Sequence, residues 1–441
     1  MSGSGLTISS AVTGPLSLVT ANNPLTITST GSVKATASGA DAIDGGSGVA
    51  WSINNSGTVA SSQRYGISLH GAGSSIVNSG SISGYSGAGG YGLELDAGGT
   101  VTNTITGGED GIIVNGAAGT INNSGQIVST FDDGASLFGG GSVINNAGAV
   151  IKAPTSGGYG PAAVYIPAGS ANVVNGGSMS GQYGVYLGVA GTVYNNGTIS
   201  GSSSAVDFAA SSSANLLQVG PHGTFTGSVN GDGGTIHLLG DPSQGGGVIG
   251  GISNSGQFWG FQSLIADTSG THNDPWVLTG SNSIANVTIN GGLMLGGFSG
   301  SSSGSGSLDV TTAVNAASTG SFDLNPGAVL EVAAATGSQT AVDFMGASQL
   351  AVDNAALFGT GIGGTSYLGS QLENFGAGDS IDIHNFSASG ATLAYDPTSG
   401  LLQLANGGEL ATLDFQQSTL GSGSFHLAAD ASGSGLSITR V

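Results

Sequence analysis

Cysteine is absent from the 441-residue chain, and lysine and arginine together supply only four residues. The missing thiols exclude disulfide bonds and thiolate metal sites. The missing cations exclude the phosphate-neutralising surface that nucleic-acid binding requires, so no nucleic-acid partner is expected. No uninterrupted apolar run approaches the length of about 18 residues that marks a membrane-spanning helix, and none is predicted.

The first twenty residues have neither a basic segment nor an uninterrupted apolar segment of the kind found in secretory signals. We therefore expect that export, if it occurs, does not use an N-terminal signal peptide.

Glycine is abundant, with 85 residues, and short apolar segments bring the hydrophobic fraction to 38%. Disordered chains lack that much apolar material, so we expect a folded chain of many small repeated elements. The net charge of −21 is uneven, with −5 over residues 1–200 and −16 over residues 201–441. Such a surface repels anionic lipid and attracts divalent cations.

A short motif of an apolar residue, asparagine and glycine recurs along the first half of the chain. It reads INNSG at Ile53–Gly57 and INNAG at Ile144–Gly148. The copies are aligned on the asparagine two residues before the glycine, and they lie 20 to 29 residues apart, a period typical of solenoids. The aligned asparagines are Asn55, Asn78, Asn123, Asn146, Asn175 and Asn195, with a degenerate copy at Asn103.

Between the motifs stand short alternating segments such as "GTVAS" and "YGISL". Three such segments and three corners per period predict an all-β fold, a right-handed parallel β-helix with Ile, Val and Leu inside. Asparagine tolerates left-handed torsions, so we interpret the aligned asparagines as corner residues. Their stacked side chains are expected to form a hydrogen-bonded ladder, with a ligand site as the alternative.

The pattern predicts three regions. Residues 1–298 form parallel coils, residues 299–307 ("SGSSSGSGS") form a loop or linker, and residues 308–441 continue the solenoid into a β-rich cap or secretion and assembly module.

Two stretches resemble known families. "WVLTGSNSIANVTINGGLML" (276–295) resembles the repeat of bacterial autotransporter passenger domains, and the coils at 50–200 are similar to adhesin and haemagglutinin-like β-helices. "LENFGAGDSIDIHNF" (372–386) resembles a segment near the end of type I-secreted proteins, matched at Phe375, Gly378, Asp379, Ile381 and Asp382. The second resemblance implies one-step export to the outside of a bacterium. The calcium repeats usual in such proteins are not present.

Parallel β-helices also include glycan hydrolases and lyases, so paired carboxylates were sought. "FDDG" places Asp132 beside Asp133, with Glu109 and Asp110 about one coil earlier. Such carboxylates could act as acid and base in glycoside hydrolysis. No histidine or lysine stands in a supporting position, so we interpret the pair as a solvated corner and expect no enzyme.

The acidic C-terminal half contains candidate metal ligands, with calcium as the ion that carboxylates favour and an exposed acidic edge without an ion as the alternative. Its candidate ligands are Asp379, Asp382, Asp396 and Asp414. His272–Asp274 is a weaker metal candidate. Trp51, Trp259 and Trp276 are interpreted as core or capping residues, with sugar stacking as the alternative.

A repetitive rod with reusable ends suggests head-to-tail stacking of copies. The leading hypothesis is a secreted structural protein that assembles into extracellular fibres or a surface layer. A monomeric adhesin that binds surface glycans is the first alternative. A glycan hydrolase or lyase that uses Asp132 and Asp133 is the second.

Overall fold

A computed structural model describes residues 5–102, 105–107, 109–157, 160–241, 246–267, 275–296, 306–333, 339–354 and 369–441. Strands are the main regular structure of these residues, which include one 3-10 turn at Thr20–Asn22 and no α-helix. The all-β prediction is therefore confirmed. None of the described segments is a helix with the length and hydropathy of a membrane span.

The chain divides into two units. Unit 1 comprises residues 1–217 and 222–232, and unit 2 comprises residues 218–221 and 233–441. Two short strands, β26 (Leu216–Val219) and β30 (Phe258–Trp259), are not among the members of the stacks named below.

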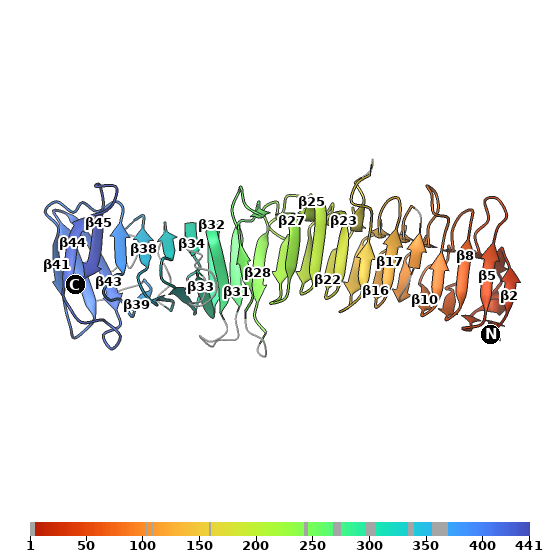
Figure 1. Ribbon diagram of the computed structural model, residues 1–441, viewed down its shortest axis with the longest axis horizontal. Helices are drawn as coiled ribbons and strands as arrows, with labels where there is room; N and C mark the ends of the chain where they lie inside the picture. Colours follow the sequence, from red (N-terminus) through yellow and green to blue (C-terminus); the bar gives the residue numbers. More distant parts are fainter. Residues whose placement is uncertain are drawn as a thin grey trace. The chain divides into compact units, whose positions relative to one another are not determined.

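Unit 1 is built from three stacks of parallel strands, and consecutive strands of the chain enter each stack in turn (Figure 1). The first stack comprises β1 (Leu6–Ile8), β4 (Leu25–Ile27), β7 (Ser52–Asn55), β10 (Ser74–Asn78), β13 (Gly99–Thr102), β16 (Gly119–Asn123), β19 (Gly141–Asn145), β22 (Ala171–Asn175) and β24 (Gly191–Asn195). We call three consecutive strands, one from each stack, a repeat.

The second and third stacks have the same parallel order. The second comprises β2 (Ala11–Thr13), β5 (Ser32–Ala35), β8 (Thr58–Ser61), β11 (Ser81–Ser83), β14 (Ile105–Gly107), β17 (Gln126–Ser129) and β20 (Val150–Lys152). The third comprises β3 (Leu16–Leu18), β6 (Ile43–Gly45), β9 (Ile67–Leu69), β12 (Leu93–Leu95), β15 (Ile112–Val114), β18 (Ala135–Leu137) and β21 (Ala162–Ile166). The long strands β23 (Ser178–Leu187), β25 (Thr198–Phe208) and β27 (Thr224–Asn230) run through both stacks.

Alternate residues of these strands are apolar and buried, as the sequence pattern predicts. Ile121 of β16 lies in register with Val143 of β19, and both side chains have 0% exposed surface. Ile127 and Ile151, neighbours in the second stack, are equally buried. A fully buried side chain of this kind contributes about 1.5–3 kcal/mol. The core therefore consists of many similar small contributions, repeated from strand to strand.

Asparagines end most strands of the first stack, and their side chains bond one another from repeat to repeat. The Nδ2 of Asn55 donates to the Oδ1 of Asn78 at 2.7 Å, and Asn175 donates to Asn195 at 2.9 Å. Between them, Asn123 donates to Asn145 at 2.8 Å, which in turn donates to Asn175 at 2.8 Å. All are at most 1% exposed, so the column satisfies buried amides that would otherwise cost free energy.

Asn146, which the glycine-based alignment predicts for this ladder, is not part of the bonded column. The turn after β19 is longer than the turn after β7. The Nδ2 of Asn145 bonds the carbonyl of Ala149, four residues later, whereas the Nδ2 of Asn55 bonds a carbonyl only two residues later. The alignment on Gly148 therefore selects the wrong asparagine. Asn146 is half-buried and donates to the Oδ1 of Asn122 at 2.6 Å.

The ladder asparagines are also not left-handed corners. Among the described non-glycine residues, only Asp232 and Asn374 have positive φ. Instead, the Oδ1 of a ladder asparagine accepts the N–H two residues later, as Asn55 does from Gly57 at 3.1 Å. Asparagine is placed here by its hydrogen bonds, which close the turn and link the repeats.

Unit 2 contains two further parallel stacks. The fourth stack comprises β28 (Thr235–Leu239), β31 (Ser263–Asp267), β32 (Trp276–Asn290), β34 (Gly306–Val314), β36 (Val329–Val332), β38 (Gln349–Val352) and β40 (Ser380–Ile383). The fifth comprises β29 (Val248–Gly250), the start of β32, β33 (Gly292–Leu295), β35 (Ser321–Leu324), β37 (Ala341–Phe344), β39 (Gln371–Glu373) and β43 (Glu409–Phe415).

Antiparallel strands follow the parallel ones at the C-terminal end of unit 2 (Figure 1). In the fourth stack, β40 pairs with β45 (Leu436–Arg440), which pairs with β44 (Phe425–Ala429). In the fifth stack, β43 pairs with β42 (Leu401–Asn406), which pairs with β41 (Thr392–Tyr395). Phe375, Phe415 and Phe425 pack together here with ring centroids 5.0 to 6.4 Å apart.

Several sequence predictions fall partly or wholly outside the described residues. Asn103 and His272–Asp274 lie outside them, as do residues 299–305 of the predicted linker. The last two linker residues, Gly306 and Ser307, are instead the first residues of β34.

Candidate ligand-binding face

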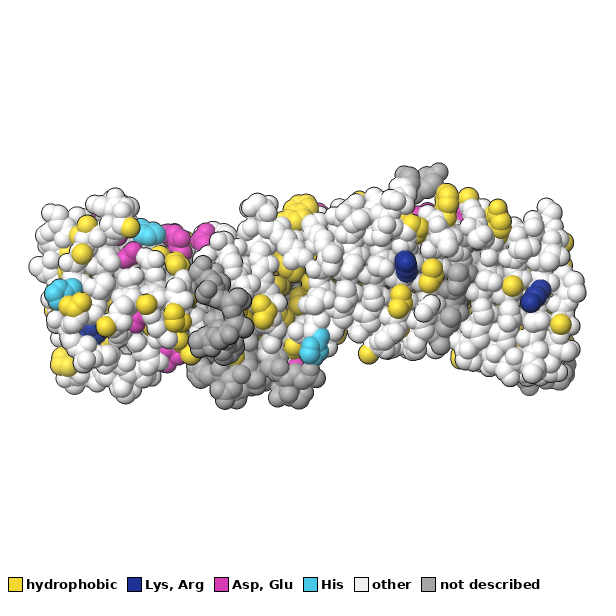
Figure 2. All heavy atoms as spheres, viewed as in Figure 1, with side chains coloured by type: hydrophobic (Ala, Val, Ile, Leu, Met, Phe, Trp, Pro, Cys, Tyr) yellow, Lys and Arg dark blue, Asp and Glu magenta, His cyan; other side chains and the backbone are white. Residues whose placement is uncertain are grey.

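The acidic side chains of unit 1 from Asp41 to Asp207 lie on, or directly beside, the strands of the third stack. The lysines at positions 34 and 152 lie on the second stack. Basic side chains are isolated on the molecular surface, which is mostly backbone and small polar side chains (Figure 2). Most of the described carboxylates of unit 1 are therefore concentrated on the third stack.

A column of side chains runs across this face on the side opposite the apolar core. It contains Ser136 of β18, then Tyr165 of β21, Tyr186 of β23 and Asp207 of β25, in register with one another. Ser136 is fully buried, whereas the two tyrosines are half-buried. The column therefore opens toward solvent as it passes from β18 to β21.

Four aromatic rings gather where the column opens. The ring centroids of Phe138 and Tyr165 are 5.9 Å apart, those of Tyr165 and Tyr186 are 5.4 Å apart, and those of Tyr183 and Tyr186 are 5.5 Å apart. Phe138 is 44% exposed. We call Phe138, Tyr165, Tyr183 and Tyr186 the aromatic strip. Phe138, Tyr165 and Tyr186 come from successive repeats, so their spacing follows the separation of about 4.8 Å between neighbouring strands, whereas Tyr183 lies on the same strand as Tyr186.

Carboxylates border the aromatic strip. Burial raises the pKa of Tyr165, and the neighbouring Tyr186, Asp133 and Asp132 raise it further. Burial and the charge of Asp207 raise the pKa of Tyr186. Both phenols are consequently held in their neutral, hydrogen-bond-donating form beside acceptor groups.

Asp133 is not the solvated corner that the sequence predicts, because it is only 8% exposed. Its Oδ1 accepts the N–H of Ala162 in the next repeat at 2.7 Å, and its Oδ2 accepts the Ser136 hydroxyl at 2.8 Å. Burial raises its pKa to about 7. One oxygen thus links Asp133 to the next repeat, and the other bonds Ser136 within its own repeat.

Asp110 repeats this arrangement one repeat earlier. Its Oδ1 accepts the N–H of Asp133 at 3.0 Å, and burial and the charge of Asp133 raise its pKa well above the usual value. Asp41 accepts the N–H of Tyr65 at 3.1 Å in the same way. The predicted proximity of Glu109 to Asp132 is confirmed, since the Asp132 N–H donates to the Glu109 carbonyl at 2.8 Å.

A second polar group lies on the same face nearer the N-terminus. His70 contacts Asp44 in the preceding repeat at 3.3 Å and bonds Asp96 in the following repeat through Nδ1. Burial lowers the pKa of His70, but the hydrogen bond to Asp96 and the charges of Asp96 and Asp44 raise it above the usual value on balance. Beside them, the hydroxyl of Ser68 donates to Glu94 at 2.8 Å.

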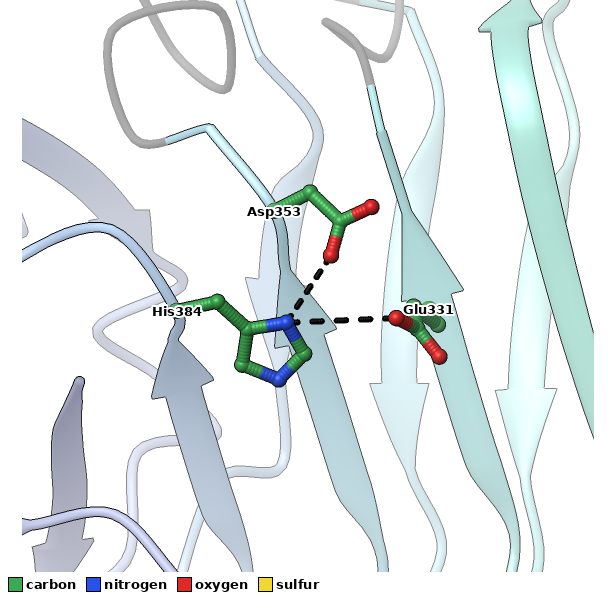
Figure 3. A group of neighbouring side chains, drawn as sticks. All are labelled: Glu331, Asp353 and His384. Carbon is green, nitrogen blue, oxygen red and sulfur yellow. Dashed lines mark hydrogen bonds and ion pairs between the residues drawn. The ribbon is translucent and has the colours of Figure 1, made fainter. Parts of the chain in front are cut away.

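Unit 2 contains one group of three potential metal ligands among its described residues: Glu331, Asp353 and His384, whose ligand atoms lie within 4.8 Å of one another (Figure 3). They come from β36 and from the residues just after β38 and β40. His384 Nδ1 lies 2.8 Å from Asp353 Oδ1 and 3.9 Å from Glu331 Oε1. One nitrogen and two oxygens could hold a divalent cation.

The four carboxylates that the sequence predicts for calcium are not brought together in such a group, since all four are described and none belongs to the trio. Asp379 closes the turn before β40 by accepting the N–H of Gly376 at 2.8 Å, and Asp382 accepts Gln349 Nε2 at 2.5 Å. Asp396 caps an exposed turn by accepting the N–H of Thr398 at 2.8 Å. Burial raises the pKa of Asp414, on β43.

Trp51 and Trp276 are 3% and 1% exposed, in agreement with the core interpretation, whereas Trp259 is 40% exposed. The aromatic strip was not anticipated from the sequence. Its signal is present in "YGVYL" (183–187), where the two tyrosines are three residues apart, but Phe138 and Tyr165 join it only once the repeats are placed in register.

Comparison of the chain with protein-family models, curated proteins and solved structures gives no match.

Proposed function

We propose that this chain is a right-handed β-solenoid exposed at a bacterial cell surface, and that it binds neutral glycan chains along the aromatic strip. The observation that supports this proposal is the succession of Phe138, Tyr165 and Tyr186 in neighbouring repeats, with ring centroids 5.4 to 5.9 Å apart from one to the next. Aromatic rings pack against the apolar faces of pyranose rings, and their hydroxyl groups bond the sugar hydroxyls.

The linear arrangement favours a polymer over an isolated sugar. The rings are spread over successive repeats along the face, with Phe138 edge to face with Tyr165 and Tyr186 tilted by 32° from Tyr165. Phe138 at one end of the strip is 44% exposed, and Asp207 lies in register with Tyr186 at the other end. A chain laid along the strip would therefore meet aromatic rings first and a hydrogen-bond acceptor next.

The charge of the face favours a neutral glycan. Asp132, Asp133 and Asp207 border the strip, and the two lysines of unit 1 lie on a different stack. Arg64, which lies beside the third stack, is paired with Asp41 at 3.1 Å. Uronic acids or sulfated sugars would bring further negative charge next to these carboxylates, which is unfavourable at short range.

A direct test is affinity electrophoresis of the whole chain in gels that contain a soluble neutral polysaccharide, such as a glucan or galactomannan. We expect at least one neutral polymer to retard the chain, while alginate, an anionic polymer, leaves its mobility unchanged. Equal retardation by alginate would contradict the proposal, and so would no retardation by any neutral polymer in a broad panel.

Self-assembly into fibres stays a prediction. End-to-end stacking of copies requires open strand edges at both ends. In unit 2 the parallel stacks continue into the antiparallel strands β41, β42, β44 and β45, so another copy would have to pair with antiparallel strands there. Binding along the side is therefore the function that the geometry supports best.

A further inference from the structure

A polar cleft of about 330 Å³ lies on the outer side of the fourth stack, in unit 2. It crosses β28, β31, β32 and the end of β34. Its lining is Thr235, Ser263, Ile265, Asn286, Thr288, Ala313 and Asn315. None of these residues belongs to the aromatic strip or to the Glu331, Asp353 and His384 trio.

A β-bulge accompanies this hollow. In the pairing of β32 with β34, Ile284 lies opposite Val310, but Asn286 lies opposite Ala313. One residue of β32, Ala285, therefore opposes two residues of β34. A bulge bends and twists the strand that carries it. The row that crosses the strands here, from Thr235 through Ser263 and Asn286 to Ala313, also consists of small side chains.

The cleft offers hydrogen-bonding groups that the protein does not use. Within the described part of the chain, the hydroxyls of Thr235, Ser263 and Thr288 make no hydrogen bond to protein. The amide of Asn286 donates to the Gln262 carbonyl at 3.3 Å, which leaves its Oδ1 as an acceptor. A wall of hydroxyl and amide groups can therefore both donate to and accept from a ligand.

Apolar surface and charge restrict the ligand further. Ile265 and Ala313 supply apolar surface to the lining. His237 and Asp267, the titratable side chains nearest in the register, contact each other, with His237 Nε2 2.5 Å from Asp267 Oδ2. No titratable side chain of the described residues lines the cleft itself, which offers neutral polar groups beside an apolar surface.

We propose that the polar cleft binds one or two residues of a neutral sugar. Its volume lies at the small end of ligand sites, which span about 300–1,000 Å³. A pyranose ring carries both apolar C–H groups and hydroxyls, and the cleft has a matching surface for each. The C–H groups can pack on Ile265 and Ala313, while the hydroxyls bond Thr235, Ser263 and Thr288. This site is independent of the aromatic strip, so either can be present without the other.

The test is a titration of the whole chain with N-acetylglucosamine, D-glucose, maltose and N,N′-diacetylchitobiose, followed by ligand-observed NMR. At least one probe is expected to bind wild-type protein. Ala313→Phe fills the cleft and should weaken that binding at least tenfold. Thr288→Val removes one hydroxyl without filling the cleft and should weaken binding less, which keeps the test decisive if Ala313→Phe does not fold.

Two controls separate this site from the aromatic strip. Thr226→Leu changes an exposed threonine of β27 in unit 1 and should leave sugar binding unchanged. The double variant Tyr165→Ala/Tyr186→Ala should retain binding of the same small sugar. The inference is overturned if no probe binds, if both cleft variants bind like wild type, or if the strip variant alone abolishes binding.

Discussion

The side-chain amide of Asn123 donates to the Oδ1 of Asn145 across 2.8 Å, and both side chains have 0% exposed surface. This bond joins two repeats inside the protein. The asparagine beside it, Asn146, lies half-buried outside the column and bonds Asn122 instead.

These neighbours give a matched pair of substitutions. Asn145→Ala should lower the free energy of unfolding by about 2–4 kcal/mol, because it leaves buried groups of Asn123 and Asn175 without their partner. Asn146→Ala should cost no more than about 1 kcal/mol, since its bonds are partly exposed to water. Urea unfolding followed by circular dichroism measures both. Equal losses for the two variants would refute the assignment of Asn145 to the ladder.

Asp133 should make stability depend on pH. Burial raises its folded-state pKa from 3.8 to about 7, so the folded state binds the proton more tightly than the unfolded state. Its contribution is therefore most favourable at low pH and is lost as pH rises from about 4 to about 7. Asp133→Asn, which does not titrate, should gain stability relative to wild type over this window, by a few kcal/mol at about 1.4 kcal/mol per pKa unit.

The measurement is urea unfolding of wild type and Asp133→Asn at about pH 5 and about pH 8. Asp396→Asn is the control, because hydrogen bonds from Thr398 and Ser399 lower the pKa of Asp396. Its contribution is present above the unfolded pKa and is lost only in acid, so the comparison with wild type should be flat from about pH 5 upward. A stability difference for Asp133→Asn that does not change with pH would contradict the burial of its charge.

His70 should act in the same direction through its charged form. Its folded-state pKa is raised by Asp96 and Asp44 against the effect of burial, so its contribution is full below about pH 6.5 and is lost as pH rises through the folded pKa. His70→Gln should therefore cost more at about pH 5.5 than at about pH 9, by no more than about 1 kcal/mol because the group is 37% exposed. Thermal unfolding at the two pH values checks the sign, and a larger cost at high pH would disprove it.

The local structure can be predicted from the sequence, because the alternation of apolar and polar residues and the turn residues act within a few positions. Ile121 and Val143 are buried where the alternation places them. The prediction fails where one turn is longer than its neighbours. Because of the extra turn residues before Gly148, the ladder asparagine of this repeat is Asn145 and not Asn146.

Contacts between repeats are harder to predict. Phe138, Tyr165 and Tyr186 are separated by more than twenty residues at each step and become neighbours only through strand register. Likewise, "FDDG" looks like an exposed acidic turn, but Asp133 is buried by its bond to the N–H of Ala162 in the next repeat. The polar cleft lies beside a β-bulge, and no residue pattern in the sequence predicts that bulge.

The most direct test of glycan binding by the aromatic strip is isothermal titration calorimetry with the neutral polysaccharide that retards the chain most in affinity electrophoresis. Tyr165→Ala and Tyr186→Ala should each weaken binding about tenfold or more, since loss of an aromatic contact costs about 0.5–1.5 kcal/mol beyond its buried area. Tyr194→Ala, on β24 in the first stack, removes a tyrosine from another face and should bind like wild type. Unchanged binding in both strip variants, with their folds intact by circular dichroism, would contradict the account.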